Sequence, residues 1–131
     1  MRYLNFAELL AINWQIAAMR QMPYGILTRS AVEEALARPQ TRIDDYEPFA
    51  SVFEKAAVLL DSLMKSRPFL SGNILTALLA ADVMLRLNGV CLKTQEEDLE
   101  QLQSISLLQM TIPQIADWLQ MRSDAQTANS L

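Results

Sequence analysis

The chain of 131 residues contains no histidine, a single cysteine and only three glycines. Without histidine, the commonest general base and the commonest transition-metal ligand of proteins are both missing. A zinc site would depend on Cys91 and carboxylates alone, so we expect no metal centre. A single cysteine also excludes an intramolecular disulfide and fits a reducing compartment.

Long apolar runs and a basic surplus are absent as well. No apolar run reaches the roughly 18 residues that a membrane span requires, and the first residues do not resemble a signal peptide. The net charge is −4 at pH 7, whereas nucleic-acid binding needs a basic stripe. We therefore expect a cytoplasmic protein with no membrane and no nucleic-acid partner. The length suits one domain with a real hydrophobic core.

Capping boxes, in which a polar residue is followed three positions later by Glu or Gln, mark several expected helix starts. These pairs are Asn5 with Glu8, Ser30 with Glu33, Thr94 with Glu97, and Thr111 with Gln114. Pro48 suits the first turn of a further helix, and apolar residues then recur at helical spacing as far as Met64.

Between Asn73 and Leu87 the only strongly polar residues are Thr76, Asp82 and Arg86. A helix that is apolar nearly all round is a buried one, so we expect this helix at the centre of the fold. Asn88-Gly89 should end it with a left-handed C-cap. The sequence thus predicts an all-α, single-domain bundle of about six helices over residues 1–122. Residues 123–131 are polar and are expected to form a frayed tail.

The strongest local signal is Arg67-Pro68-Phe69-Leu70-Ser71-Gly72-Asn73-Ile74-Leu75-Thr76-Ala77, which joins two expected helices. Its Ser-Gly-Asn lies at a helix start, where free backbone N–H groups and the helix dipole attract anions. Ser71, Gly72 and Asn73 are therefore candidate anion-binding residues. The simpler interpretation is that Ser71 caps the helix and Gly72 lets the turn close. No acid occurs in this stretch, and no Lys or Arg follows Asn73 within it.

This stretch resembles the motif H-P-F-x-D-G-N-K-R-T-A of the Fic/Doc family. That family includes the death-on-curing toxins of bacterial toxin–antitoxin pairs and the Fic AMP-transferases. Six positions match and would form the scaffold of the motif: Pro68, Phe69, Gly72, Asn73, Thr76 and Ala77. Flanking residues 53–57 and 85–90 are similar too, and the likeness extends over roughly residues 3 to 122. Residues 35–40 resemble the segment that leads into the family's substrate-binding flap.

Four positions differ, and the resemblance places the family's chemistry on them. The motif His, which accepts a proton from a target hydroxyl, corresponds to Arg67, and a guanidinium, which is charged at neutral pH, cannot accept that proton. The magnesium-binding acid corresponds to Ser71, which brings no charge to a hard cation. The two phosphate-binding cations, an electrostatic clamp of the kind that is often the largest catalytic term, correspond to Ile74 and Leu75.

The resemblance and these losses together predict a catalytically degenerate Fic/Doc-family protein that binds a partner instead of transferring nucleotides. It would resemble the toxin of a toxin–antitoxin pair, with an antitoxin-like segment as partner and no cofactor; self-association stays open. One alternative is a surviving transferase that AMPylates or phosphorylates proteins from ATP and Mg²⁺, with Asp61, Asp44 or Asp45 as replacement base. Another is a structural helical domain without activity. Ile74 and Leu75 would lie either under a collapsed pocket or against a bound protein or apolar ligand.

Overall fold

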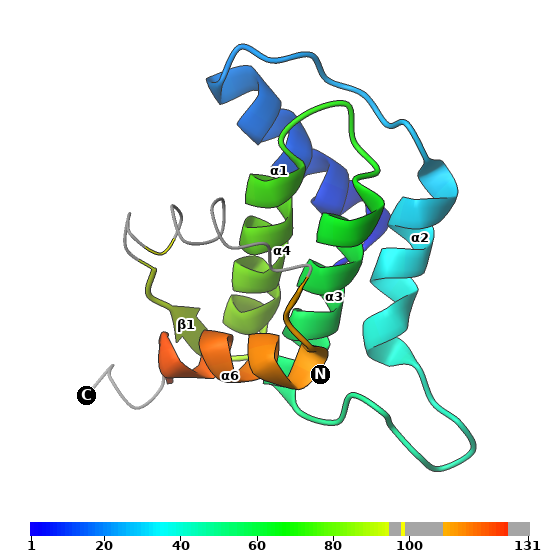
Figure 1. Cartoon of the computed structure of the whole chain (residues 1–131), viewed down its shortest axis with the longest axis vertical. Helices are drawn as coiled ribbons and strands as arrows, with labels where there is room; N and C mark the ends of the chain where they lie inside the picture. The colour runs from blue at the N-terminus through cyan, green and yellow to red at the C-terminus, as the bar shows by residue number, and fades with distance from the viewer. Residues whose placement is uncertain (95–97, 99–108, 126–131) are drawn as a thin grey trace.

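The computed structural model of the chain describes residues 1–94, 98 and 109–125 and is a bundle of α-helices (Figure 1). Its elements in chain order are α1 (Phe6–Met19), α2 (Arg29–Ala37), the 3₁₀-helix η1 (Arg38–Gln40), α3 (Val52–Ser66), α4 (Asn73–Leu87), β1 (Val90–Leu92), α6 (Ile112–Met121) and β2 (Ser123–Ala125). The all-α prediction is confirmed, apart from one short strand pair. Of the helix predicted to begin after Thr94, all but Asp98 lies outside the described residues. In the part of the chain that the structure describes, no helix is long and apolar enough to cross a membrane.

Two of the predicted helix starts are confirmed as complete capping boxes. At the start of α1, the Asn5 side chain accepts a hydrogen bond from the Glu8 N–H at 2.8 Å. The Glu8 carboxylate accepts one from the Asn5 N–H at 3.0 Å. Thr111 and Gln114 form the same reciprocal pair at the start of α6. Each box satisfies two of the N–H groups that a helix start leaves free.

The predicted start of α2 is wrong. The helix begins at Arg29, with Thr28 as N-cap and no capping side chain, so Ser30 lies inside it. The cause is tertiary, because the Pro68 carbonyl accepts hydrogen bonds from the N–H groups of Leu27 and Thr28 and fixes the chain there. Glu33 is consequently free to pair with Arg29, at 3.0 Å on the helix surface.

The predicted start of α3 is also wrong. The helix begins at Val52 instead of near Pro48, because Ser51 and Glu54 form a full capping box that defines the first turn. Residues 48–50 therefore belong to the connection from η1. Phe49 in this connection lies under the Arg38 guanidinium, 5.9 Å from the ring centre.

The centre of the bundle is formed by α3 and α4 together (Figure 1). α4 has the predicted bounds, and about half of its residues are buried, while Leu79 is 38% exposed. α3 is buried more completely, from Lys55 to Met64 without interruption, because α2, η1, α4 and α6 all pack against it. The buried polar side chains of α3, Lys55, Asp61 and Ser62, have polar or charged partners. Lys55 Nζ, for example, donates to the Pro39 carbonyl at 2.9 Å.

The chain after α4 turns at Gly89, whose φ of +82° is the left-handed conformation predicted there. β1 and β2 then pair antiparallel, with Val90 opposite Ala125 and Leu92 opposite Ser123. Residues 123–125 are therefore part of the fold, contrary to the expectation of a frayed tail from residue 123 onward. Residues 126–131 lie outside the described residues.

Candidate functional site

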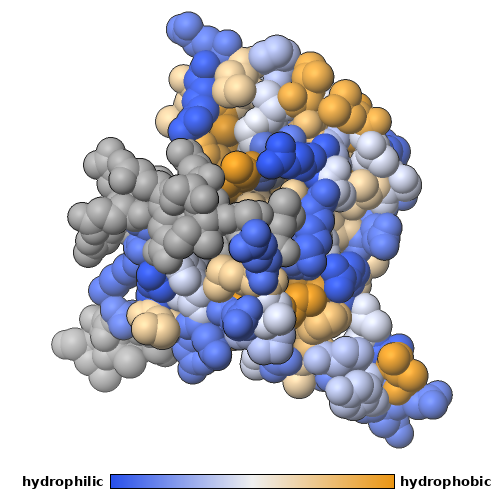
Figure 2. Space-filling view, in the orientation of Figure 1, coloured by the Kyte–Doolittle hydropathy of each residue, from blue (hydrophilic) through white to orange (hydrophobic). Residues whose placement is uncertain are grey.

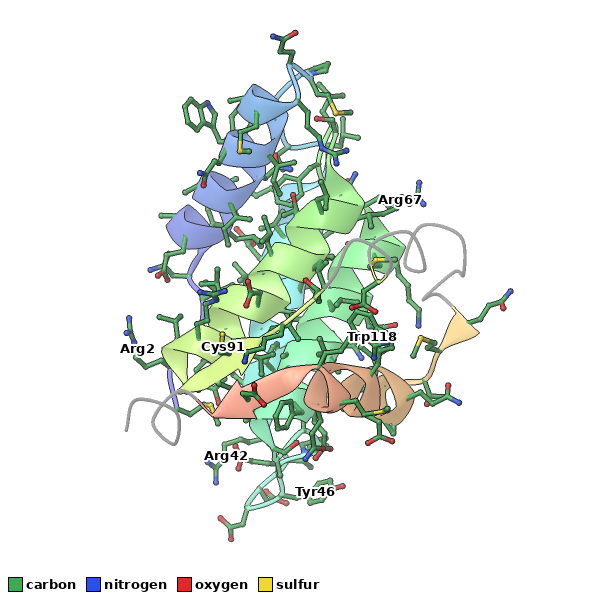
Figure 3. The ribbon with its side chains drawn as sticks, turned by 90° about the vertical axis from the view of Figure 1, so that its left-hand side faces the viewer. Arg2, Arg42, Tyr46, Arg67, Cys91 and Trp118 are labelled. Carbon is green, nitrogen blue, oxygen red and sulfur yellow. The ribbon has the colours of Figure 1, made fainter. Side chains whose placement is uncertain are left out.

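The motif turn, residues 67–72, lies at one end of the bundle, where α3 ends and α4 begins (Figure 1). Arg67 is the C-cap of α3 and has a left-handed backbone with φ +45°. Its side chain is exposed and extends away from the ribbon (Figure 3). The loop between α1 and α2 runs beside the turn, since the Leu70 N–H donates to the Gly25 carbonyl at 2.9 Å. Two segments that are distant in the sequence thus form one surface.

The residues of the motif that match the family are used to build this turn. Pro68, Phe69, Thr76 and Ala77 are all buried, and Phe69 and Ala77 belong to the hydrophobic core. The Asn73 side chain closes the turn on itself. Its Oδ1 accepts from the Phe69 N–H at 3.0 Å, and its Nδ2 donates to the Phe69 carbonyl at 2.9 Å. Both ends of the Asn73 amide are therefore occupied within the protein.

Ser71 does not cap α4, contrary to the simpler interpretation of the sequence. Its hydroxyl donates to the Pro23 carbonyl at 2.6 Å, and the side chain is buried. Gly72 is the N-cap, with φ +71°, and no side chain caps the helix. The N–H groups in the first turn of α4 are thus left without a side-chain acceptor.

Asn13 of α1 fixes the turn from the inside, a role that the sequence analysis missed. Its Nδ2 donates to the Ser71 carbonyl at 2.9 Å and to Thr76 Oγ1 at 3.0 Å. Asn13 is only 1% exposed, and its Oδ1 has no hydrogen-bond partner among the described residues. The available signal was the spacing of Leu9, Asn13 and Ile16, which places an amide among core-facing apolar residues.

An open pocket of about 270 Å³ lies beside the start of α4. Its lining residues are Arg20, Met22, Arg67, Gly72, Asn73, Ile74 and Leu75. Ile74 and Leu75 are both partly exposed, so the pocket has not collapsed over them. Arg20, at the end of α1, brings a second guanidinium that the motif itself does not contain. Sequence reasoning missed Arg20 because only the tertiary fold brings α1 to this place.

None of the carboxylates considered as replacement bases lines this pocket. Asp61 is buried in α3, with Lys65 Nζ at 3.0 Å and an Arg38 nitrogen at 3.7 Å. Asp44 and Asp45 lie in the turn between Ile43 and Tyr46. Figure 3 shows Tyr46 at the opposite end of the molecule from Arg67.

The residues after Gln40, where the resemblance placed the substrate-binding flap, are also at this far end. They form a small hairpin in which the N–H groups of Ile43 and Tyr46 each donate to the other residue's carbonyl, at 2.8 and 2.9 Å. The segment that lies against the motif turn is instead the loop from Gly25 to Thr28, with Ile26 bridged to Phe69. A partner that contacts the motif turn and an extended segment beside it would therefore contact the loop from Gly25 to Thr28.

This architecture and motif define the family. Residues 3–85 match the model of the Fic/DOC family, and this match covers more than half of the chain and includes the motif turn. The chain belongs to the Fic/DOC family, as the sequence predicted. A curated relative, Toxin Doc of Mycolicibacterium smegmatis (strain ATCC 700084 / mc(2)155), is 38% identical over 67 residues. The aligned region covers 51% of this chain and 48% of that protein, so the chain spans about half the length of the relative.

The side chains of the pocket do not fit a magnesium nucleotide. The position that the resemblance assigns to the metal ligand is Ser71, which carries no charge, is buried and does not line the pocket. The positions of the two phosphate-binding cations are the aliphatic Ile74 and Leu75. What remains are two guanidinium groups and the first N–H groups of α4, which suit a single carboxylate or a small anion. Among the described residues, no three His, Cys, Asp or Glu side chains lie close enough to hold a metal ion.

Proposed function

We propose that this toxin-like Fic/DOC-family protein is catalytically degenerate and acts by binding a protein partner at the motif turn. One observation carries the proposal: two arginines and two aliphatic side chains line the pocket where nucleotide transfer needs a base, a metal ligand and a phosphate clamp. The turn itself is intact, because Pro68, Phe69, Thr76 and Ala77 are buried and the Asn73 amide is hydrogen-bonded to Phe69. The fold of the site is thus retained, while the groups for its chemistry are replaced.

The missing base is the first argument against transfer. A target hydroxyl must lose a proton as it attacks phosphorus, and a positioned general base contributes on the order of 10² to 10⁴ in rate. The guanidinium of Arg67 has no lone pair to offer at neutral pH. Asp61 cannot substitute, because it is buried between Lys65 and Arg38 and does not line the pocket.

The shape of the pocket is the second argument. Its volume of about 270 Å³ is small beside the range of about 300–1,000 Å³ typical of small-molecule sites, and close to its lower end. Met22, Ile74 and Leu75 give it an apolar wall, which would desolvate a nucleotide phosphate without offering it a hydrogen bond. One or two side chains of a protein segment would fill such a space. An antitoxin-like segment is the partner we propose, since the relative above is named as a toxin.

A transfer assay tests the proposal. The purified chain is incubated with a bacterial extract, magnesium and ATP labelled at either the α- or the γ-phosphate. We expect no labelled protein beyond that in the extract alone. The matched variant carries Arg67→His, Ser71→Asp, Ile74→Lys and Leu75→Arg together, and shows whether the scaffold supports transfer once the groups are supplied. Transfer by the unmodified chain that is lost in Arg67→Ala or Asn73→Ala would contradict the proposal.

A further inference from the structure

Two stretches without any Asp or Glu meet at the motif end of the molecule. Residues 9–32 and residues 62–81 contain no acidic residue, although the whole chain has a net charge of −4. The fold joins the two stretches, because the Leu27 N–H donates to the Pro68 carbonyl at 2.7 Å and the Leu70 N–H donates to Gly25. Although this protein is acidic overall, these two stretches therefore supply no carboxylate at its motif end.

The cations at this end differ in how they are paired. Arg29 is bound by Glu33 at 3.0 Å, and Lys65 by Asp61 at 3.0 Å. Arg20 and Arg67 have no carboxylate partner within the described residues, and both line the pocket at the start of α4. These two guanidinium groups carry the unbalanced positive charge of the motif end. Each can accept a carboxylate without breaking an ion pair that the described residues form.

Large apolar side chains are exposed on the same two stretches. Met22 is 41% exposed, Tyr24 46%, Leu27 65% and Leu70 48%. Figure 2 shows hydrophobic surface at the end of the molecule where the loop between α1 and α2 lies. Clustered exposed apolar residues next to a charged pocket are typical of an interaction surface. We call Arg20, Met22, Tyr24, Leu27, Arg67, Leu70, Ile74 and Leu75 together the motif-end face.

We propose that the motif-end face docks an acidic, amphipathic segment of a partner protein. An Asp or Glu of the segment binds between Arg20 and Arg67, and a neighbouring apolar side chain enters the pocket against Ile74 and Leu75. The inference rests on the proposed function and adds the chemistry of the partner. Charge complementarity carries it, because the described residues of the face offer two free guanidinium groups and no free carboxylate.

The pocket within the face favours a protein segment over an anionic membrane surface. A surface that binds a bilayer presents a broad apolar face flanked by basic residues, whereas here two arginines and two aliphatic side chains line one open pocket that one or two side chains would fill. Hydrogen bonds between charged groups contribute enough that removing one should weaken binding about tenfold or more. Reversal of both charges should therefore remove detectable binding of an acidic segment.

Selection from a phage-displayed library of random linear peptides tests the proposal without requiring the identity of the partner. The full chain is the bait, in parallel with Arg20→Glu/Arg67→Glu and with the control Arg2→Glu/Arg42→Glu. Arg2 and Arg42 are exposed and lie away from the motif end (Figure 3). We expect enriched peptides that combine Asp or Glu with large apolar residues. Synthetic copies should bind the chain and the control alike, lose binding to the motif-end variant, and weaken as salt is raised.

Four results would overturn the proposal: no enriched peptides, enriched peptides without acids, binding that survives in the motif-end variant, or binding to vesicles of phosphatidylcholine and phosphatidylglycerol in place of peptides. Circular dichroism of each variant shows whether it is folded. The results of the peptide experiments and of the transfer assay test different claims. Nucleotide transfer would refute the proposed function even if acidic peptides bind, whereas absent peptide binding without transfer would refute only the chemistry of the partner.

Discussion

Gly72 is the residue on which the geometry of the motif turn depends most strictly. Its φ of +71° is left-handed, and a Cβ added there would lie 3.0 Å from Ile16 Cγ2 of α1. Both the backbone conformation and the close approach of α1 therefore favour glycine. Gly89 has a similar φ of +82°, but nothing lies within 4 Å of the position of its absent Cβ. A comparison of these two glycines therefore separates the cost of backbone strain from the cost of steric contact.

Replacing Gly72 by alanine should destabilise the fold more than replacing Gly89. We expect Gly89→Ala to cost about 1–2 kcal/mol, the strain of a left-handed non-glycine residue. Gly72→Ala should cost about 1 kcal/mol more, because Ile16 or the helix that carries it must shift. Urea unfolding of both variants measures the difference. Equal losses would mean that α1 does not hold the turn as closely as described.

The amide of Asn13 should be the main polar link between α1 and the motif turn. Asn13→Ala leaves the buried Thr76 hydroxyl and the Ser71 carbonyl without this donor, which should cost about 1–3 kcal/mol. Thr76→Val removes only one of the two bonds and serves as the comparison. A double-mutant cycle between the two positions should show a coupling of about 0.5 kcal/mol or more. Additive losses would show that the Asn13–Thr76 bond is not formed in solution.

At the residue scale, the sequence identifies the motif positions but not the tasks of their side chains. Its local pattern marks Gly72 and Asn73 for anion binding, yet the Asn73 amide is used to close the turn. The same pattern favours Ser71 as a helix cap, but its hydroxyl bonds to Pro23. Nothing in the pattern points to Arg20. In each case the deciding neighbour is remote in the sequence or lies across the turn, and local patterns carry no information about it.

At the scale of elements, the hairpin after η1 depends on a buried cation in α3. Lys55 is 2% exposed, and its Nζ donates to the Pro39 carbonyl at 2.9 Å and to Glu47 at 3.3 Å. The ammonium also lies 5.4 Å from the centre of the Tyr3 ring. Its partners therefore come from the N-terminal segment, η1 and the connection that follows the hairpin. Lys55 thus ties three separate segments to α3.

Lys55→Met keeps most of the side-chain volume and removes these polar contacts. We expect a loss of about 1–3 kcal/mol, because the Pro39 carbonyl is left unpartnered. Amide exchange at Ile43 and Tyr46 should also become faster, since the hairpin loses its tie to α3. The matched change Arg29→Met breaks an exposed pair with Glu33 and a contact with the Phe6 ring, and should cost at most about 1 kcal/mol. Unchanged exchange at the hairpin in Lys55→Met would contradict the role given to Lys55.

The helix boundaries show which elements the sequence could predict. α1, α4 and α6 were placed well, because capping boxes or a left-handed glycine mark their ends in the sequence itself. The start of α2 was missed because a hydrogen bond to the distant Pro68 carbonyl sets it. The start of α3 was missed because a capping box at Ser51 prevails over the proline at position 48. Tertiary contacts and competing local signals explain the two errors.

At the scale of the whole molecule, the sequence predicted the family and the all-α architecture, because the buried motif residues shape the turn and the helices around it. It did not predict the surface at the motif end. That surface forms only when the loop after α1 packs beside the turn and brings Arg20 and Met22 to the pocket. The fold is thus encoded by local patterns, while the candidate binding site is assembled from segments that are distant in the sequence.

The central claim is that the motif turn no longer binds a magnesium nucleotide. Isothermal titration of the full chain with ATP, in the presence and absence of magnesium, tests it most directly. The variant that carries Arg67→His, Ser71→Asp, Ile74→Lys and Leu75→Arg is titrated beside it. We predict no saturable, magnesium-dependent binding to the unmodified chain at millimolar ATP, and a gain of such binding in the folded variant. Saturable binding of ATP to the unmodified chain that requires magnesium would contradict the account.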